Sequence, residues 1–377
     1  MQKTVAIIQL EQSRRDIKRF LSVPYAIYRN DPNWVAPLQI DRISLLLPSN
    51  PFFEHADIAF WIATRGGQDV GTIAAIVDDN YNAFHHEKAA FFGFFECIND
   101  AAVARALLDV VLAWAQQQGA THVLGPMNPS TNEECGLLVE GFSGPPTLMM
   151  PYNPPYYAQL LETGGFTKAK DLLAFYVDVA ACPLDRLARI ADRTLQRHTE
   201  LKLQPVTRKT MAADLAKIKT VYNSAWEANW GFVPMTAAEI DFMAARLKPL
   251  FREGLVWYAE WNGSPVGFLL ALPDYNIALK HLHGKLISKG IVRALPYLAG
   301  WRVPPRCRVV TLGVTKEYRN RGIEAAMLAQ GFTYGMRMGI TEAEASWVLE
   351  DNTVMCRMME FFGGRVYRRY RIYGCKL

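Results

Sequence analysis

The sequence predicts an α/β protein of two related halves, each a mixed β-sheet with helices on both faces. Two observations carry this prediction. Strand-like and helix-like segments alternate along the chain, and short motifs of the first half recur in the same order in the second. The chain has 377 residues, 50% of them hydrophobic and 20% charged, which is enough apolar material for more than one core.

The first repeated element is a β-hairpin. Residues 61–71 (WIATRGGQDVG) align with residues 257–267 (WYAEWNGSPVG), and each places a glycine turn between two strand-like runs. Two further matches follow in the same order: Gly119 and Thr121 with Gly339 and Thr341, then Asn153 and Gly164 with Asn352 and Gly363. These matches predict a duplication, with domains at residues 1–180 and 206–377 and a linker at 181–205.

A long helix follows the hairpin in each half. Apolar residues recur at helical spacing in residues 100–118 and 320–338. Asn99 or Asp100 caps the first of these helices, and Gly119 ends it. Strands are expected at residues 309–314 and 341–346, on either side of the second helix.

Composition and missing motifs exclude several classes of protein. The formal net charge of +5 is small for this length and does not indicate a nucleic-acid partner. The six cysteines form no CxxC pair, and His281 and His283 have no third ligand nearby in the sequence, so we expect reduced thiols and no metal. No signal peptide, membrane-spanning run, GxSxG, Walker A or GxGxxG motif is found, and we expect a cytoplasmic protein.

The segment richest in chemistry runs from a β-branched strand through a basic turn into a helix. The unpaired N–H groups at a helix N-terminus suit a phosphate. Gly322 would let the backbone approach closely, and Arg319 and Arg321 would add charged donors. The alternative is an ordinary helix start with solvated arginines.

The spacing Val314-x-x-x-x-Arg319-x-x-Gly322 resembles the acyl-CoA pyrophosphate motif of the GNAT (Gcn5-related N-acetyltransferase) superfamily, and Asn352 with Gly363 resembles its last helix. The resemblance implies two tandem GNAT-like domains, each with a mixed, centrally splayed sheet. It implies acyl-CoA or acetyl-CoA as co-substrate and direct transfer of the acyl group to an amine. The donor site it implies has Val314 at the pantetheine arm and, at the pyrophosphate, Arg319, Asn320, Arg321, Gly322, Ile323, Glu324 and Ala325.

Three positions depart from the family pattern. Glu324 stands where the motif has Gly or Ala, and a carboxylate beside a pyrophosphate is unfavourable. Met359 stands where the family often has a tyrosine general acid. At the equivalent place in the first half Asp100 would repel a phosphate, so we expect a degenerate first domain that binds no CoA and serves the acceptor or the structure.

Other segments resemble a bacterial group of double-GNAT proteins similar to bacterial ceramide synthase. They are residues 25–34, 91–96, 149–154 and 346–352. This resemblance implies transfer of a long-chain acyl group to a sphingoid-type lipid amine. The turn-rich loops at residues 31–34, 50–55 and 125–136 either line the acceptor channel or are solvated turns.

A general base is needed for attack by an amine. Strand alternation places Glu342, Glu344 and Ser346 on one face. Either the arginines of the terminal strands (Arg365, Arg368, Arg369 and Arg371) neutralise these carboxylates, or one of the carboxylates is the base. Glu344, then Glu350, are the candidate bases, and with Asn352 they form the predicted catalytic set.

Residues 275–316 contain eight Lys or Arg and no Asp or Glu, interleaved with apolar residues. Such a stretch is typical of a membrane-surface segment or of a face that binds polyanions, and a solvated basic helix is the alternative. It predicts a peripheral contact with an anionic inner membrane. The leading function is an acyl-CoA-dependent N-acyltransferase. The alternatives are a non-catalytic acyl-CoA-binding protein, an acetyltransferase for a small soluble amine, and an aminoacyl or peptidyl transferase.

Overall fold

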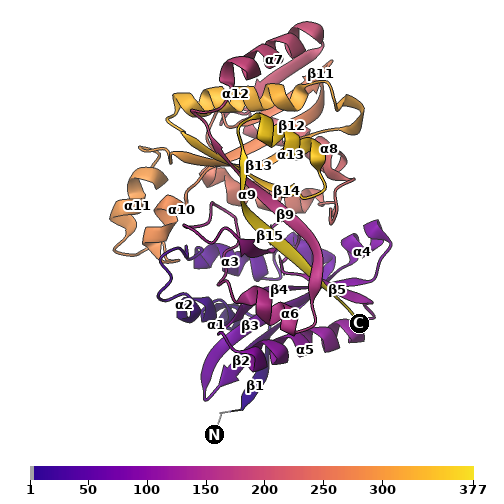
Figure 1. The fold of residues 1–377 in the computed structure, drawn as a ribbon, viewed down its shortest axis with the longest axis vertical. Coiled ribbons are helices and arrows are strands. Elements are labelled where there is room, and N and C mark those ends of the chain that lie inside the picture. The colour runs from indigo at the N-terminus through magenta and orange to yellow at the C-terminus, as the bar shows by residue number, and fades with distance from the viewer. Residues whose placement is uncertain (1–3) are drawn as a thin grey trace. The chain divides into compact units, whose positions relative to one another are not determined.

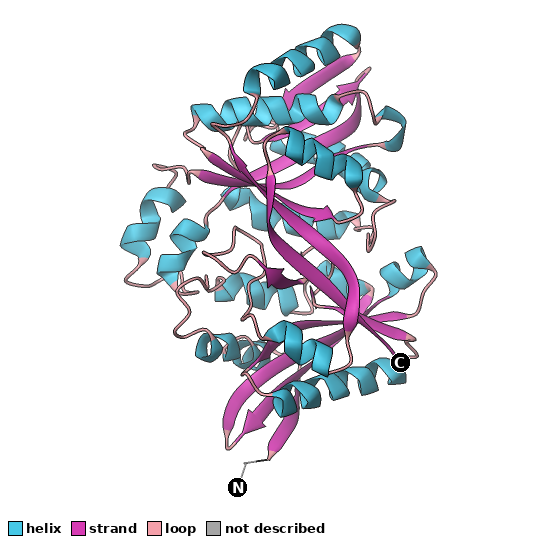
Figure 2. Cartoon of the chain, viewed as in Figure 1, coloured by secondary structure: helices cyan, strands magenta, loops and turns pink. Residues whose placement is uncertain are grey.

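The computed structural model describes residues 4–377 and divides into two compact units that interleave along the chain. Unit 1 comprises the residues up to 172 with 278–294 and 368–377, and unit 2 comprises 173–277 and 295–367 (Figure 1). Each unit is a β-sheet with helices, as Figure 2 shows, which confirms the predicted α/β class. The ranges 1–180 and 206–377 stay a prediction about the two repeats.

The sheet of unit 1 is mixed. Its strands run in the order β1-β2-β3-β4-β5, antiparallel as far as β4, and β5 is parallel to β4. The C-terminal part of β15 pairs with both β5 and β8. The bounds are β1 Val5–Leu10, β2 Ala56–Arg65, β3 Gln68–Asp78, β4 Ala89–Cys97, β5 His122–Gly125, β8 Leu137–Glu140 and β15 Arg365–Lys376, with a separate pair β6 Met127–Asn128 and β7 Glu134–Cys135.

Helices cover both faces of this sheet. One core contains residues of α5 and α6, and another contains residues of α1, α2 and α3 packed on Phe60, Ile62 and Ala74 of the opposite face. The bounds are α1 Arg14–Phe20, α2 Val23–Ile27, α3 Gln39–Leu46, η1 Pro51–Glu54, α4 Asp79–His85, α5 Ala101–Gln117 and α6 Tyr157–Thr163.

Unit 2 repeats this plan. Its strands run in the order β9-β14-β13-β12-β11-β10, and β13 and β14 are parallel, whereas β10 to β13 pair antiparallel. The bounds are β9 Thr167–Asp178, β10 Leu201–Pro205, β11 Val256–Trp261, β12 Ser264–Pro273, β13 Arg306–Val314 and β14 Glu342–Leu349. The hairpins predicted at 61–71 and 257–267 are the turns β2–β3 and β11–β12.

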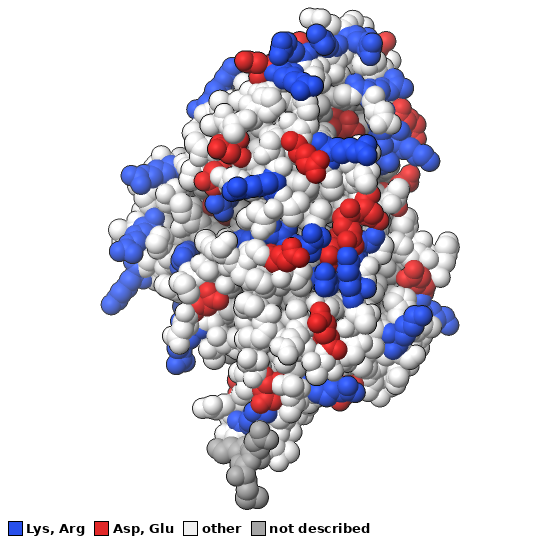
Figure 3. Space-filling view, in the orientation of Figure 1, with Lys and Arg blue, Asp and Glu red and all other residues white. Residues whose placement is uncertain are grey.

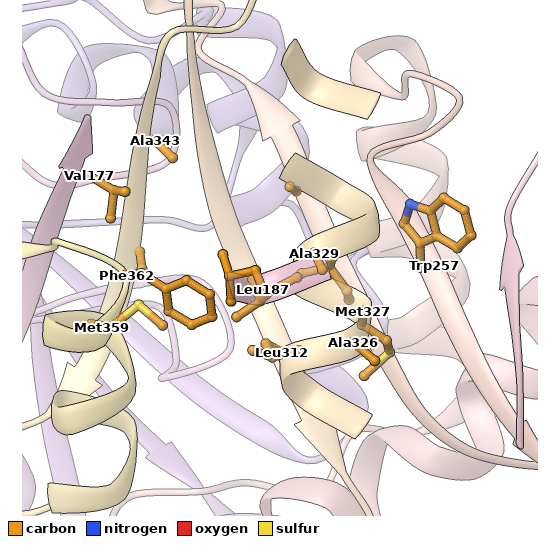
Figure 4. Packing of buried hydrophobic residues seen from close by; sticks show 14 of the residues in the cluster. Val177, Leu187, Trp257, Leu312, Ala326, Met327, Ala329, Ala343, Met359 and Phe362 are labelled. Atoms are coloured by element: carbon orange, nitrogen blue, oxygen red, sulfur yellow. The ribbon is translucent and has the colours of Figure 1, made fainter. Parts of the chain in front are cut away.

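The helices of unit 2 also lie on both faces. A core beneath α7, α12 and α13 includes Leu187, Met327 and Met359, and Figure 4 shows Met359 and Phe362 pointing toward Leu187. A second core joins α8 to Tyr258 and Phe268. The bounds are α7 Leu184–Arg197, α8 Met211–Trp226, α9 Ala237–Leu247, η2 Lys248–Leu250, η4 Lys316–Tyr318, α12 Ile323–Arg337 and α13 Thr353–Phe361. The basic stretch, whose residues 278–294 belong to unit 1, contains α10 Asn276–Leu279, η3 Lys280–Leu282 and α11 Ile291–Leu298. The predicted linker at 181–205 therefore folds as α7 and β10.

The parallel pair of each unit separates before its strands end. In unit 2 the register stops at Val309 and Ala345, whereas β13 continues to Val314 and β14 to Leu349. In unit 1 it stops at Phe91 and Leu124 while β4 continues to Cys97. A β-bulge interrupts the neighbouring antiparallel pair in both units. Both sheets are thus splayed at the centre, as predicted.

The two long helices begin differently. Asp100 is the N-cap of α5, and its carboxylate accepts hydrogen bonds from the N–H groups of Ala102 and Val103. The second helix begins at Ile323 rather than at the predicted residue 320, because Asn320 and Gly322 have φ values of 61° and 82° and cannot continue a right-handed helix. No helix within residues 4–377 combines the length and hydropathy needed to cross a bilayer.

Candidate functional site

At the N-terminus of α12, in unit 2, backbone N–H groups are available as hydrogen-bond donors. Gly322 is its N-cap and makes no side-chain capping bond. The first helical bond runs from the N–H of Ala326 to the carbonyl of Gly322. Within the described chain, the backbone N–H groups of residues 320–325 form no hydrogen bond with another residue, and that of Glu324 bonds its own carboxyl group. These groups stand at the end of β13, beside the splay, where an anion would be stabilised.

Gly322 is required there for two reasons. Its φ of 82° lies in the left-handed region that glycine adopts without strain. A Cβ at this position would also lie 2.6 Å from Oγ1 of Thr194 on α7. The close approach of α7 leaves no room for a side chain, so the backbone of the cradle stays bare.

The two arginines of the motif are engaged with the protein. The Nε of Arg319 donates to the carbonyl of Val314 at 3.1 Å, and its Nη2 donates to the carbonyl of Ala225 at 2.9 Å. The guanidinium of Arg321 lies 4.9 Å from the ring centroid of Trp261 and 5.4 Å from that of Tyr318. Arg319 therefore ties the β13–α12 turn to the end of α8, and the cradle's own donors are backbone N–H groups.

Glu324 lies half-buried in the first turn of α12. Burial raises the pKa of this carboxyl, and a hydrogen bond from its own backbone N–H and the charge of Arg319 oppose the rise. A raised pKa lowers the ionised fraction at a given pH, which reduces the repulsion that a carboxylate here would exert on a phosphate.

The equivalent helix start in unit 1 is already occupied by a carboxylate. Asp100 accepts hydrogen bonds from the first turn of α5 and from Nη1 of Arg65 at 2.7 Å. The Arg65 hydrogen bond is the main cause that lowers the pKa of Asp100 to about 2. The side chain thus holds a permanent negative charge where an incoming phosphate would have to bind.

The splay of unit 1 is filled as well. The amide of Asn128 reaches β4, and its Oδ1 accepts a hydrogen bond of 2.6 Å from the backbone N–H of Phe94. The carbonyl of Met127 packs on Gly93 so closely that a Cβ on this glycine would lie 1.7 Å from it. Residues 127–128 therefore cover the edge of β4 that would otherwise stay open where β4 and β5 diverge.

Glu344 lies at the inner end of the splay in unit 2. Glu344 is 0% exposed. Its cross-strand partner in the β13–β14 register is Arg308, which is 2% exposed. One carboxylate oxygen accepts a bond of 2.6 Å from Oγ of Ser346, and the other accepts a bond from the hydroxyl of Tyr367. Arg308 donates through Nε to the same Ser346 hydroxyl at 2.9 Å. These contacts favour a structural role for Glu344.

The other predicted catalytic residues lie at the outer end of β14. Glu350 is half-buried in the turn that follows the strand. Asn352 is the N-cap of α13, and its Oδ1 accepts the N–H of Met355 at 3.1 Å. Met359, where relatives often have a tyrosine, is 4% exposed and belongs to the core. Of the predicted carboxylates, Glu350 is the one that solvent reaches at the open end of the splay.

The terminal-strand arginines have other partners of their own. Arg368 donates to the carbonyls of Gly141, Ser143, Gly144 and Pro145. Arg369 and Arg371 pair with the buried carboxylate of Asp171, and Glu342 pairs with Arg306 at 2.8 Å. Sequence reasoning missed Arg308 as the partner of Glu344, although its place opposite Glu344 follows once the parallel register is known.

The described residues contain no group of three or more His, Cys, Asp or Glu arranged to hold a metal ion.

Comparison with known proteins places this geometry in a family. Residues 215–363 match the model of the acetyltransferase (GNAT) family. The chain is 34% identical over 372 residues to Protein YghO of Escherichia coli (strain K12), covering 96% of this chain and 93% of that protein. It is also 34% identical over 370 residues to the bacterial ceramide synthase of Caulobacter vibrioides, covering 95% of this chain and 94% of that protein. The chain belongs to the GNAT family.

The fold of this GNAT protein has a close counterpart among solved structures. A tandem GNAT protein from the clavulanic acid biosynthesis pathway superposes with a TM-score of 0.59 over 99% of this chain and 98% of that one. Sequence identity is 13%, so the match supports the tandem fold alone. The predicted family resemblance and the predicted fold class are both confirmed by these comparisons.

Proposed function

We propose that the protein transfers an acyl group from acyl-CoA or acetyl-CoA to an amine, with the donor bound by unit 2. The observation that carries the proposal is the open N-terminus of α12, where the backbone N–H groups of residues 320–325 have no hydrogen-bond partner in another residue. These donors match the oxygens of a pyrophosphate. The free edge of β13 beyond Val309 would pair with the amide groups of the pantetheine arm, as far as Val314.

The reaction is direct. The amine nitrogen attacks the thioester carbonyl, a C–N bond forms, the C–S bond breaks, and CoA leaves as the thiolate. The amine loses a proton to a base, and the thiolate takes up a proton from solvent or from a nearby acid. Glu350 is the candidate base because solvent reaches it at the open end of the splay. Glu344 and Asn352 support the site through β14 and the start of α13.

A lipid amine is the proposed acceptor. The support is the 34% identity over nearly the whole chain to a protein named bacterial ceramide synthase. A long-chain acyl donor and a sphingoid-type amine follow from that likeness, and an acetyltransferase for a small soluble amine is the alternative. A second alternative is a protein that binds acyl-CoA without catalysis. Two features support it: the carboxyl group of Glu324 in the donor motif, and the core position of Met359 where relatives often have a tyrosine acid.

Release of free CoA separates these functions. The full-length protein is mixed with palmitoyl-CoA or acetyl-CoA and with either sphinganine or a short soluble amine, and the thiol produced is measured. We expect thiol release with palmitoyl-CoA and sphinganine. Release only with acetyl-CoA and the soluble amine would favour the alternative enzyme, and binding without release would show an acyl-CoA-binding protein.

The stoichiometry of donor binding should be one CoA per chain. Asp100 and Arg65 occupy the helix start in unit 1, and Asn128 occupies its strand edge. Calorimetric titration with CoA should therefore give a single site. Two equivalent sites per chain would contradict the assignment of the donor to unit 2 alone.

The basic stretch at residues 275–316 supports peripheral contact with a membrane. Large apolar side chains stand exposed along it, with Ile287 97%, Val292 75% and Trp301 74% exposed. Lys280, Lys285, Lys289 and Arg293 are exposed among them, and Figure 3 shows Lys and Arg side chains over α10 and α11 at the left of the view. Apolar side chains beside cations, without any acid, complement an anionic lipid surface.

Binding to vesicles should depend on these charges. Sedimentation with phosphatidylglycerol-containing vesicles should be strong at low salt and weaken as salt is raised. Replacing Lys280, Lys285, Lys289 and Arg293 with Gln should reduce the vesicle affinity at least about tenfold, because each cation near the surface contributes roughly 1 kcal/mol. CoA affinity should not change.

The matched control removes four exposed cations elsewhere, with Lys202, Arg208, Lys209 and Lys248 changed to Gln. This variant has the same net charge as the first and should bind vesicles nearly as the wild type does. Equal losses in both variants would show that net charge, and not this stretch, attracts the membrane. No vesicle binding by the wild type would exclude a membrane contact.

A further inference from the structure

Three motifs of the first half meet around Tyr28, beside the carboxylate of Glu96, in unit 1. Glu96 is the last but one residue of β4, at the end of the Phe-rich run 91–96. Tyr28 comes from the run 25–34, and Tyr152 from the run 149–154. These segments are far apart in the sequence, and the donor site in unit 2 uses none of them. Tyr28 is the residue that joins these segments, since it contacts both Tyr152 and Glu96.

Hydroxyl groups surround the Glu96 carboxylate. Tyr157 on α6 donates to its Oε2 at 2.8 Å and accepts the N–H of Cys97 at 2.8 Å. Tyr28 on α2 donates to the carbonyl of Tyr152 at 3.2 Å and lies within hydrogen-bonding reach of Glu96. Tyr156 donates to the carbonyl of Cys97 at 2.8 Å. The carboxylate is thus held in place by two tyrosine hydroxyls, one from α6 and one from the end of α2.

Aromatic rings extend this cluster toward solvent. The ring of Tyr28 stacks on Trp34 with centroids 4.8 Å apart and lies 6.3 Å from the ring of Tyr152. Trp34 also meets Tyr25 edge to face at 5.1 Å. Tyr28 and Tyr157 are buried, whereas the residues Glu96, Trp34 and Tyr152 are each partly exposed, so the cluster extends to the surface of unit 1. A carboxylate beside aromatic faces is a favourable environment for an organic cation.

The pKa of the Glu96 carboxyl group lies near neutral pH. Burial raises its pKa to about 7, while hydrogen bonds from Tyr157 and Tyr28 and the charge of Arg42 oppose the rise. The titratable and charged groups that face it are Tyr28 of α2, Arg42 of α3, Cys97 of β4, and Tyr156 and Tyr157 of α6. Burial raises the pKa of each of these tyrosines and of Cys97, so they stay neutral while Glu96 titrates.

We propose that Glu96 and the rings of Tyr28, Trp34 and Tyr152 form a binding site for a primary alkylamine, whose ammonium group pairs with the Glu96 carboxylate. The site assigns a ligand to unit 1, which the CoA donor does not use. Only the choice of an alkylamine as ligand rests on the proposed function. Glu96 is here a binding residue for the amine, and no step of the acyl transfer is assigned to it.

The test measures amine binding by the full-length protein without acyl-CoA. n-Octylamine is titrated by calorimetry at pH 8, with n-octanol as the neutral probe of the same length. We expect octylamine to bind and Glu96→Gln to weaken it at least tenfold. Octanol should bind weakly and equally to both proteins. The matched control is Glu54→Gln, an exposed carboxylate of the same unit, which should bind octylamine like the wild type.

The pH dependence distinguishes an ion pair from a structural role. Glu96 ionises as the pH rises through about 7, while an alkylammonium group, like lysine, stays charged to about pH 10. Octylamine affinity should therefore rise about tenfold between pH 6 and pH 8 in the wild type and stay flat in Glu96→Gln. Tyr157→Phe removes a donor to the carboxylate and should move the midpoint to higher pH while the amine still binds.

Unchanged octylamine affinity in Glu96→Gln, or no affinity in the wild type, would overturn the site. CoA affinity serves as the folding control and should be the same in all variants. Amine binding that depends on Glu96, without any CoA release, would support this site and refute the acyltransferase proposal. Acylation with an unchanged KM for the amine in Glu96→Gln would support the acyltransferase and refute the site.

Discussion

Gly322→Ala should lower the affinity for CoA at least tenfold, or about 1.4 kcal/mol. The new Cβ would lie 2.6 Å from Oγ1 of Thr194, and the left-handed φ of 82° would be strained for alanine. Both effects displace the N–H groups of residues 320–325 that would receive the pyrophosphate. Isothermal titration with CoA measures the change directly.

Gly339→Ala is the matched control at the other end of α12. Gly339 has a φ of 85°, and a Cβ there would meet no atom within 4 Å. This variant should carry a similar backbone strain, roughly 1 kcal/mol of unfolding free energy, without touching the cradle. Its CoA affinity should equal that of the wild type. Equal affinity in both glycine variants would show that α12 does not receive the phosphate.

Arg308→Leu should be the most destabilising single change, at roughly 3–5 kcal/mol of unfolding free energy. The variant leaves Glu344, which is 0% exposed, without the cation across the strand and without the donor that orients Ser346. A buried carboxylate that loses its partner pays the full desolvation penalty. Urea unfolding followed by circular dichroism gives the free energy.

Arg306→Leu is the control on the same strand. Arg306 pairs with Glu342 at 2.8 Å, but both side chains are about one third exposed, so this pair should contribute no more than about 1 kcal/mol. The double variant Arg308→Leu/Glu344→Leu should recover much of the loss, because it removes the unpaired charge. Similar losses in the two single arginine variants would contradict a buried charge network at the splay.

For Glu344, the local sequence pattern predicted the strand face but not the role of the side chain. Strand alternation predicted that Glu342, Glu344 and Ser346 share a face of one strand, and the bond between Ser346 and Glu344 agrees with this. The choice between a base and a structural acid depended on partners outside the strand. Those partners, Arg308 and Tyr367, are 36 and 23 residues distant (344 − 308 and 367 − 344), and only the register of the sheet brings them to Glu344.

In the donor motif, too, the sequence predicted the role of one residue and not that of others. Its glycine could be interpreted from the sequence, because an unstrained φ of 82° is a property of glycine itself. The roles of Arg319 and Arg321 could not, since a guanidinium binds whichever carbonyl or ring the fold places near it. Here these are Val314 and Ala225 for Arg319, and Trp261 and Tyr318 for Arg321.

The sequence by itself determined the α/β class, the repeated hairpins, the long helices and the turn that opens α12, because these depend on residue periodicity and on glycine over short distances. Only the tertiary structure decided that Asp100 pairs with Arg65, that Asn128 bonds the edge of β4, and that Trp34 and Tyr152 pack on Tyr28. Such contacts join segments far apart in the chain, so their chemistry depends on strand pairing and packing, which no short motif encodes.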